Sequence, residues 1–503
     1  MVDLSNHRAD VVVVGGGVAG CAAALSAARR GASVTMLTSL PDPEETNTRY
    51  AQGGIIYTGP EDSPALLARD ILSAGANAGD PRAARLLAQE GPQLVKRLLI
   101  EELEVPFDRD DGGFEGLHLT REGAHSADRI IHRRDTTGSA IQAAMSAAVA
   151  EEGRITVVPG ARATSLAVER PSGRCAGVYA DYEGEGVEIR GRSVVLATGG
   201  LGGLYAHTTN PPGATGDGVA LAMAAGARVR DLHYVQFHPT ALYTSGERFL
   251  ISEAVRGEGG VLRDPEGREF VDHPLGSLAP RDVVAREISA MMVRTGSPCA
   301  YLDITHRSRG WISSRFPAIF ARCLEDGVDP SRDPIPVVPA AHYSCGGIAT
   351  DERGRTSVRG LWAAGEVART GLHGANRLAS TSLLEGLVWG YGSGEDAARP
   401  GPAPNGPLRP AGRAAIPDAA PREAWDKLRE TMWLRAGLVR DAAGLERGLR
   451  ELSALEEECG GTELDAPLSV CRVIVEGALG ERRSLGCHYR AGAEEKRVAD
   501  LPG

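Results

Sequence analysis

The first hydrophobic run of the chain is followed by closely spaced glycines and then by an alanine-rich segment. Residues 11–14 are four valines, a β-branched run that predicts a strand buried on both faces. Gly15, Gly17 and Gly20 follow at GxGxxG spacing, and residues 18–31 predict a helix. Such an element binds the pyrophosphate of a dinucleotide at the helix N-terminus. The alternative is a glycine-rich turn in an ordinary βαβ unit.

Later patterns predict further strands of the same sheet. Residues 33–37 predict the second parallel strand, whereas 193–203 and 361–367 each predict a strand that runs into glycines. The acidic residue that holds a ribose hydroxyl in many dinucleotide sites, about 20 residues beyond the glycines, is missing. Thr38 and Ser39 stand there instead, so ribose recognition must use hydroxyl groups or residues elsewhere in the chain.

The order of these patterns predicts an α/β fold with a Rossmann-like dinucleotide-binding domain that is interrupted by an α+β insertion. Residues 400–422 are rich in proline and alanine, which is typical of a linker, and helical apolar spacing follows. The expected parts are a first binding segment at 1–226, an inserted domain at 227–345, a second binding segment at 346–399, a linker at 400–422 and a C-terminal helical bundle at 423–503.

Composition narrows the classes of function. The 503 residues carry 66 acidic and 55 basic side chains, a net charge of −11 that gives no support for broad nucleic-acid binding. The eight cysteines lack CxxC or zinc-ligand spacing, so we expect reduced thiols and no metal site. We see no signal peptide before Val11 and no apolar run of the roughly 18 residues that a membrane span requires. These features predict a cytoplasmic protein that does not bind membranes.

A series of short motifs identifies a family. Besides the N-terminal glycine turn, they are TNTRYAQGG at 46–54, LATGG at 196–200, GDG at 216–218, QFHPT at 236–240, SEAVRGEGG at 252–260, PRD at 280–282, HYSCGG at 342–347, AAGEV at 363–367 and GANRLAS at 374–380. In this order and spacing, the chain resembles the flavoproteins of the succinate dehydrogenase and fumarate reductase family, and within it most closely the L-aspartate oxidases. The resemblance covers nearly the whole chain.

This resemblance implies FAD as the dinucleotide and makes the inserted domain a cap over the substrate. Membrane-bound relatives bond FAD covalently through a histidine, and the corresponding position here is Asn47, so we expect non-covalent FAD. By similarity Glu366 bonds ribityl or ribose hydroxyls, and Asp217 supports the adenine half. The implied cofactor-binding residues are Gly15, Gly17, Val18, Ala19, Gly20, Ser39, Thr46, Asn47, Thr48, Ala51, Gln52, Gly53, Asp217, Glu366, Ser382 and Leu383.

The family also implies a dicarboxylate substrate, which needs cationic groups at both ends in a site closed to water. Arg377, His342 and His238 match the positions that clamp the carboxylates. Ser252 adds a hydroxyl donor where relatives often carry threonine. Without the motifs, each of these histidines is more simply explained as a core or surface residue.

Arg281 matches the proposed proton-transfer arginine of the family. Because a free arginine has a pKa of about 12.5 or more, it is a poor base in isolation. Glu253 and Arg256, three residues apart on a predicted helical turn, resemble a relay that serves it. The alternative is a structural ion-pair network without proton transfer.

Glu122, in the REGxHS stretch at 121–126, bears on the choice of substrate. It matches the glutamate that lies near the substrate amino group in the aspartate-oxidising relatives, and a carboxylate there attracts an ammonium but not succinate. Without the family, Glu122 is more simply a solvated loop acid.

The expected function is FAD-dependent oxidation of L-aspartate to iminoaspartate by hydride transfer. By resemblance, oxygen or fumarate reoxidises the flavin and the imine feeds quinolinate synthase in NAD biosynthesis. A soluble fumarate reductase or succinate dehydrogenase flavoprotein is the first alternative, and a non-catalytic flavin-binding protein is the second. The C-terminal RRSLGCHYR at 482–490 keeps only part of the family's ESRG-x-H-x-R pattern, which puts the contact between the helical and FAD domains in doubt.

Overall fold

The computed structural model describes residues 4, 7–244, 246, 248–401, 404, 406–412 and 416–492. Its largest sheet has the strand order β18-β7-β8-β9-β1-β2-β6, and β16 also pairs with β9. The strands of this sheet are β1 (Arg8–Val14), β2 (Val34–Thr38), β6 (Ile155–Pro159), β7 (Ala161–Glu169), β8 (Cys175–Tyr182), β9 (Glu185–Leu196), β16 (Leu361–Ala363) and β18 (Leu408–Pro410).

The predicted N-terminal strand, turn and helix are confirmed. The four valines end β1, which pairs in parallel with β2 on one side and β9 on the other, so both edges of the strand are covered. Helix α1 (Val18–Arg29) begins directly after the glycine turn. Because β16 also runs parallel to β9, the carboxyl ends of β1, β9 and β16 meet at one edge of the sheet, where doubly wound folds bind ligands.

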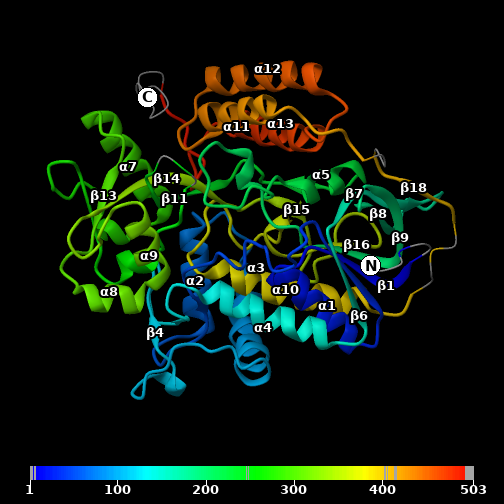
Figure 1. Ribbon diagram of the computed structural model, residues 1–503, viewed down its shortest axis with the longest axis horizontal. Coiled ribbons are helices and arrows are strands. Elements are labelled where there is room, and N and C mark those ends of the chain that lie inside the picture. The colour runs from blue at the N-terminus through cyan, green and yellow to red at the C-terminus, as the bar shows by residue number, and fades with distance from the viewer. Residues whose placement is uncertain are drawn as a thin grey trace.

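Helix α10 (Thr381–Ala397) packs along α1 (Figure 1), although more than 350 residues separate the two starts. Small residues allow this close approach. A Cβ atom at Gly390 would lie 2.4 Å from the carbonyl oxygen of Ala19, and one at Gly394 would lie 2.0 Å from that of Ala23. The contact holds the N-terminal ends of both helices beside the same edge of the sheet.

A second sheet, with the order β11-β14-β13-β12, forms within the predicted insertion and has its own hydrophobic core. In Figure 1 it lies at the left, in green. Its elements are β11 (Val235–Leu242), α6 (Glu253–Gly257), β12 (Val261–Arg263), α7 (Arg281–Thr295), β13 (Ala300–Asp303), α8 (Arg309–Arg315), α9 (Pro317–Glu325) and β14 (Ile335–Ser344). Strand β10 (Val229–Arg230) also lies within the predicted insertion, 227–345. Its partner strand, β15 (Gly347–Ala349), lies outside the insertion.

The C-terminal helices α11 (Arg422–Ala436), α12 (Ala442–Cys459) and α13 (Asp465–Gly480) stack together at the top of Figure 1. Their apolar faces join the core on the neighbouring face of the main sheet. Within the predicted linker, β18 pairs antiparallel with β7. The interpretation of 400–422 as a bare linker therefore misses an edge strand, where a proline such as Pro410 is tolerated.

The remaining elements include two more small sheets, β3-β5-β4 and β10-β15-β17. The elements not yet named are β3 (Ile55–Ile56), α2 (Pro64–Ala74), α3 (Pro81–Leu94), the π-helical turn η1 (Val95–Glu102), η2 (Phe114–Gly116), β4 (Leu119–Thr120), β5 (Ile130–Ile131), α4 (Thr137–Glu151), η3 (Gly202–Leu204), α5 (Asp217–Ala224), η4 (Gly276–Leu278), η5 (Gly365–Val367) and β17 (Ala368–Arg369). No helix among the described residues is long and apolar enough to span a bilayer. The predicted domain boundaries stay predictions.

Candidate active site

One cavity lies at the carboxyl ends of β1, β9 and β16 and extends to the second sheet. It is lined by all the residues predicted for cofactor and substrate except Gly20, and by Arg281 and Glu253 of the predicted relay. Gly20 instead packs against the turn, since a Cβ there would lie 2.0 Å from the carbonyl oxygen of Gly15. Arg256 is fully buried behind the cavity wall. The described residues contain no group of three or more potential metal ligands.

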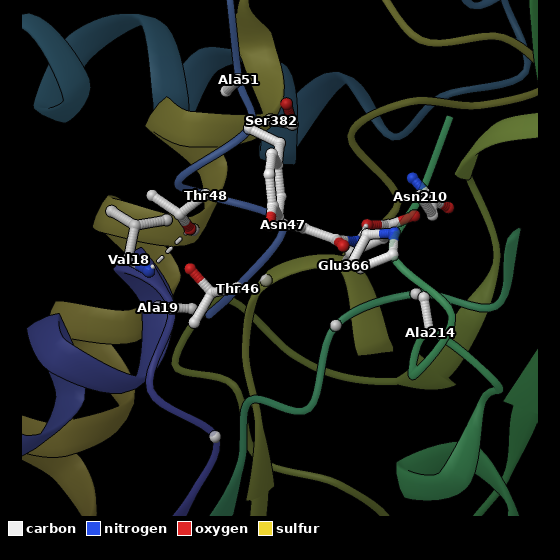
Figure 2. A pocket seen from close by; sticks show the side chains of 18 of the residues that line it. Val18, Ala19, Thr46, Asn47, Thr48, Ala51, Asn210, Ala214, Glu366 and Ser382 are labelled. Atoms are coloured by element: carbon white, nitrogen blue, oxygen red, sulfur yellow. Dashed lines mark hydrogen bonds between the residues drawn. The ribbon is translucent and has the colours of Figure 1, made fainter. Parts of the chain in front are cut away.

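The glycine turn leaves room and hydrogen-bond donors at the start of α1. Gly15 has φ +114°, and a Cβ there would lie 2.1 Å from the carbonyl oxygen of Ala197. The N-cap position of the helix, Gly17, supplies no side-chain cap, whereas the N–H of Val18 donates to Thr48 Oγ1 at 3.0 Å, the dashed contact in Figure 2. The N–H of the next residue, Ala19, has no hydrogen-bond partner among the described residues, and Ala19 lines the cavity, so the end of α1 still offers a backbone donor, as a pyrophosphate requires.

Glu366 lies deep in the cavity and is paired with neutral groups. Its Oε1 accepts from the N–H of Ser344 at 2.9 Å, and its Oε2 accepts from Asn47 Nδ2 at 3.3 Å. Figure 2 shows the Asn47 side chain extending toward Glu366. Burial raises the pKa of Glu366 to about 7, against the lowering effect of the Ser344 hydrogen bond. Such a group can both accept and, when protonated, donate a hydrogen bond to a sugar hydroxyl.

Asp217 begins α5 and lines the cavity. Its carboxylate accepts from Thr215 Oγ1 at 2.6 Å and from Arg162 Nη2 at 3.1 Å. Arg162 also lines the cavity and comes from β7, a strand outside the recognised motifs. Sequence reasoning therefore found the acid of this pair but missed its basic partner.

Arg377 and His342 are in direct contact. Arg377 Nη2 donates to His342 Nε2 at 3.1 Å, and Nη1 donates to Ser382 Oγ at 2.7 Å. Because the guanidinium can only donate, Nε2 of His342 is the acceptor, so its Nδ1 carries the proton and donates to Thr209 Oγ1 at 2.8 Å. Burial and the charge of Arg377 lower the pKa of His342 well below its ordinary value, in agreement with a neutral ring.

The ring of His238 lies edge-on to that of His342, with centroids 4.9 Å apart. Its Nδ1 accepts from the N–H of Thr240 at 3.2 Å, which leaves Nε2 as the protonated nitrogen. Burial, followed by the charge of Arg281, lowers the pKa of His238 well below its usual range. The two histidines are thus neutral polar groups on one wall of the cavity.

Arg281 begins α7 and binds a carboxylate on α6. Its Nε donates to Glu253 Oε2, and its Nη1 donates to Gln236 Oε1 at 3.2 Å. Glu253 also lies 3.5 Å from Nη2 of Arg256. Burial alone would raise the pKa of Glu253, but the two arginines outweigh burial and lower it. The predicted grouping is present, and its role in proton transfer stays a prediction.

Glu122 is buried, unlike a solvated loop acid, with a 4% exposed side chain. Its Oε2 accepts from Ser380 Oγ at 2.7 Å. Burial, and then the nearby charge of Glu253, raise its pKa. Gly53 leaves space for it, since a Cβ there would lie 2.7 Å from Glu122 Oε1. A buried acid with one neutral partner is a site for a cationic group.

Ser252 lies at the start of α6, where its hydroxyl accepts from the N–H of Ala254 at 3.2 Å. Its own N–H donates to Gln52 Oε1 at 3.1 Å. The hydroxyl therefore caps the helix, and its hydrogen remains available to a ligand.

Sequence comparison decides the family. Residues 10–383 match the FAD binding domain model. The chain is 46% identical to the L-aspartate oxidase of Caulobacter vibrioides, covering 95% of this chain and 92% of that protein. It is 44% identical to that of Mycobacterium tuberculosis, covering 96% and 92%. The chain belongs to the L-aspartate oxidase family. FAD is its cofactor.

Solved structures match the fold of this chain. E. coli quinol fumarate reductase matches with a TM-score of 0.86 at 27% identity, covering 98% of this chain and 93% of that one. Mycobacterium smegmatis Sdh1 matches with a TM-score of 0.80 at 30% identity, covering 96% and 89%. The FAD-binding fold of the succinate dehydrogenase and fumarate reductase flavoproteins is thereby confirmed.

The C-terminal segment 482–490, which carries the altered pattern, still contacts the loop beside the site of this L-aspartate oxidase family member. The N–H of Cys487 donates to the carbonyl oxygen of Ala375 at 3.0 Å, two residues before Arg377. His488 Nδ1 accepts from Arg440 Nη1 at 2.8 Å, and the carbonyl of Gly486 accepts from Arg286 Nη1 at 3.1 Å. The helical region and the cofactor-binding region are therefore in contact despite the lost residues.

Besides Arg162, sequence reasoning attached no role to the following residues in or near the cavity: Thr209, Gln236, Tyr343 and Ser380. The last three lie inside recognised motifs, so the signal was present but no role had been attached to them. Thr209 lies outside every motif, and only the fold places it beside His342.

Proposed function

We propose that this chain oxidises L-aspartate to iminoaspartate. The observation that carries the proposal is that one cavity brings together a buried acid, Glu122, a buried arginine, Arg377, and the buried hydrogen-bond donors His238 and Ser252. This arrangement is complementary to a molecule with one ammonium and two carboxylates. Succinate would leave Glu122 buried without a cationic partner, which costs binding free energy.

The residues of the cavity fit FAD. Backbone N–H groups at the start of α1 would hold the pyrophosphate, with the space that Gly15 and Gly17 leave. Glu366 would bond ribityl or ribose hydroxyls, and Asp217 would support the adenine half. When bound, FAD supplies the acceptor for a hydride at its N5 atom. The N-terminus of α10, at Ser382, would favour negative charge on the reduced ring.

The clamp for the substrate carboxylates would consist of Arg377, His342 and His238. Arg377 can donate two parallel hydrogen bonds to one carboxylate. The Nε2–H of His238 and the hydroxyl of Ser252 can donate to the other. In the structure Arg377 uses His342 and Ser382 as partners, so a bound carboxylate would replace hydrogen bonds to neutral groups by charge-assisted ones.

The substrate ammonium must lose one proton before a hydride can leave its α-carbon, and a neutral Arg281 would accept that proton after the relay of Glu253 and Arg256 has taken up the proton of the guanidinium. Support comes from their geometry, since Glu253 Oε2 is shared by both arginines. The relay must pass this proton on before the next cycle. Because all three groups are buried, water cannot exchange protons with them directly and bypass the relay.

We propose that oxygen or fumarate is the electron acceptor. We also propose that the reaction is the first step of NAD biosynthesis and that its product supplies quinolinate synthase. The likeness to E. coli quinol fumarate reductase supports fumarate. The cytoplasmic location stays a prediction.

Anaerobic bleaching of the flavin tests the proposal. Purified FAD-loaded protein is mixed without oxygen with L-aspartate, D-aspartate or succinate, and the visible absorption of the flavin is followed. L-Aspartate should bleach it much faster than the other two. Equal bleaching by succinate would favour a soluble fumarate reductase or succinate dehydrogenase flavoprotein. No bleaching by any of the three would favour a non-catalytic flavin-binding protein.

A further inference from the structure

Arg377 is a buried cation whose hydrogen-bond partners are all neutral. Its side chain is 5% exposed, and it donates to Ser382 and His342. Among the described residues, no carboxylate lies within ion-pair distance of it. Burial and the charge of Arg281 lower its pKa to about 10. A cation in such surroundings needs another source of electrostatic stabilisation.

The ring of Tyr343 supplies that stabilisation. The Cζ atom of Arg377 lies 4.5 Å from the centroid of this ring. Both side chains are buried, and a cation over an aromatic face is held more strongly when water is excluded. The ring also limits where the guanidinium can lie, because the cation is held over one face of the ring.

The hydroxyl of Tyr343 is in turn held by a buried carboxylate on α10. It donates to Glu385 Oε2 at 2.9 Å. The same oxygen accepts from His373 Nε2 at 2.8 Å, and Oε1 accepts from Thr370 Oγ1 at 2.5 Å. Glu385 is 1% exposed, so these three contacts take the place of water.

Both partners of the Tyr343–Glu385 hydrogen bond have the protonation that it requires. Burial, and then the charge of Glu385, raise the pKa of Tyr343 well above its ordinary value, so the phenol keeps its proton. Burial alone would raise the pKa of Glu385, but His373, Thr370 and Tyr343 outweigh it and lower the pKa. A phenol that donates to a carboxylate gains electron density in its ring, which strengthens the attraction for a cation on the ring face.

Helix α10 therefore contacts the arginine by two routes. Ser382 accepts directly from Arg377, and Glu385, three residues further along the same helix face, acts through Tyr343. We propose that Glu385 is a positioning residue for substrate binding, which orients Arg377 through the ring of Tyr343 so that the guanidinium is ready for a substrate carboxylate. The inference rests on the proposed function, in which Arg377 binds that carboxylate.

The test is a double-mutant cycle with Glu385→Gln, Tyr343→Phe and the double variant. Each FAD-loaded protein is assayed for kcat and KM with L-aspartate. The Kd of malonate, a dicarboxylate that cannot be dehydrogenated across a carbon–carbon bond, is measured anaerobically from the shift in flavin absorption. Each single change should raise KM and Kd about fivefold or more while kcat changes less than about threefold. The malonate Kd of the double variant should be no higher than that of the single variant with the higher Kd. Both changes break the same hydrogen bond between Tyr343 and Glu385, so their effects should not add.

Tyr179→Phe is the matched control. It removes a tyrosine–glutamate hydrogen bond of the same length, to Glu188 Oε2 at 2.9 Å, between residues that do not line the cavity, so KM and the malonate Kd should stay within about twofold of the wild type. If Glu385 only stabilises the fold, Glu385→Gln will lower the melting temperature or the FAD content but leave KM and the malonate Kd unchanged. If Glu385 acts independently of Tyr343, the effects of the two single changes on the malonate Kd will add as free energies in the double variant. Either result overturns the inference.

Two further outcomes are separable. If Glu385→Gln does not fold, Tyr343→Phe decides alone, since it removes only the hydroxyl, and an unchanged malonate Kd contradicts the inference. If the wild type is not bleached by L-aspartate, the proposed function fails, whereas the malonate Kd of the variants still reports whether Glu385 positions Arg377.

Discussion

Arg377 is the residue on which the proposed carboxylate clamp depends most. We expect Arg377→Leu to raise the KM for L-aspartate roughly tenfold or more, because a charge-assisted contact with the substrate is lost. Steady-state kinetics over a wide range of L-aspartate concentration measures this. Arg369→Leu is a suitable control, since Arg369 pairs with Asp231 and does not line the cavity. An unchanged KM in Arg377→Leu would remove the residue from the clamp.

Glu122 should make the site selective for L-aspartate over succinate. Glu122→Gln keeps an oxygen that can accept from Ser380 but removes the charge that would pair with the ammonium of L-aspartate. We expect kcat/KM for L-aspartate to fall roughly tenfold or more, with succinate binding as tightly as before or more tightly. Parallel assays with both compounds measure the ratio. If the ratio stays constant, Glu122 does not select the substrate.

Glu366 should make the stability of the apoprotein depend on pH in a defined direction. Its folded pKa, about 7, lies above the ordinary value of 4.5. The stability contributed by the protonated group is therefore fully present below about pH 4.5 and is lost as the pH rises through about 7. We expect the melting temperature of FAD-free wild type to fall relative to Glu366→Gln over this range. A constant difference between the two proteins would contradict this assignment.

At the residue scale, the site residues could be predicted from the sequence because they lie in motifs that combine unusual residue types with fixed spacing. The predicted site residues come from many separate segments, and all but Gly20 and Arg256 line one cavity. What could not be predicted is how these residues contact one another. The partners of Glu122 and His342, Ser380 and Thr209, lie 258 and 133 positions away in the chain, and no local pattern encodes such a distance.

At the scale of elements, the turn between β1 and α1 depends on the lack of a side chain at Gly15. We expect Gly15→Ala to weaken FAD binding at least tenfold, because the added Cβ would lie 2.1 Å from the carbonyl oxygen of Ala197 and φ is +114°. The FAD-to-protein ratio after purification and a titration of apoprotein with FAD measure the effect. Gly153→Ala is the control, since no atom lies within 4 Å of its Cβ position. Normal FAD content in Gly15→Ala would contradict the prediction.

The strands and helices with strong periodicity were predictable, whereas short elements were not. Strand β18 lies in a proline- and alanine-rich stretch and is three residues long. Its pairing with β7 depends on the position of a sheet edge formed much earlier in the chain. Local composition therefore predicted a linker where tertiary contacts hold a strand.

At the scale of the whole molecule, the C-terminal segment packs against the loop that carries Arg377. A Cβ at Gly486 would lie 2.4 Å from the carbonyl oxygen of Ala375, and φ is +54°. We expect Gly486→Val to lower the melting temperature by a few degrees and to raise the KM for L-aspartate about threefold or more, because the loop is displaced. Gly492→Val, with open space around its Cβ position, should change neither. A lower melting temperature with unchanged KM would limit the contact to a structural role.

The close packing of α1 and α10 has a consequence for how the protein is made. A ribosome releases α1 long before it synthesises Gly390, whose backbone lies against Ala19, and later still Cys487, which holds the loop before α10. Before residue 366 is made, the nascent chain has a pyrophosphate cradle but no Glu366 and no Ser382. A complete cofactor site therefore requires synthesis through at least the start of α10, and a chain that ends earlier lacks the helix that covers α1.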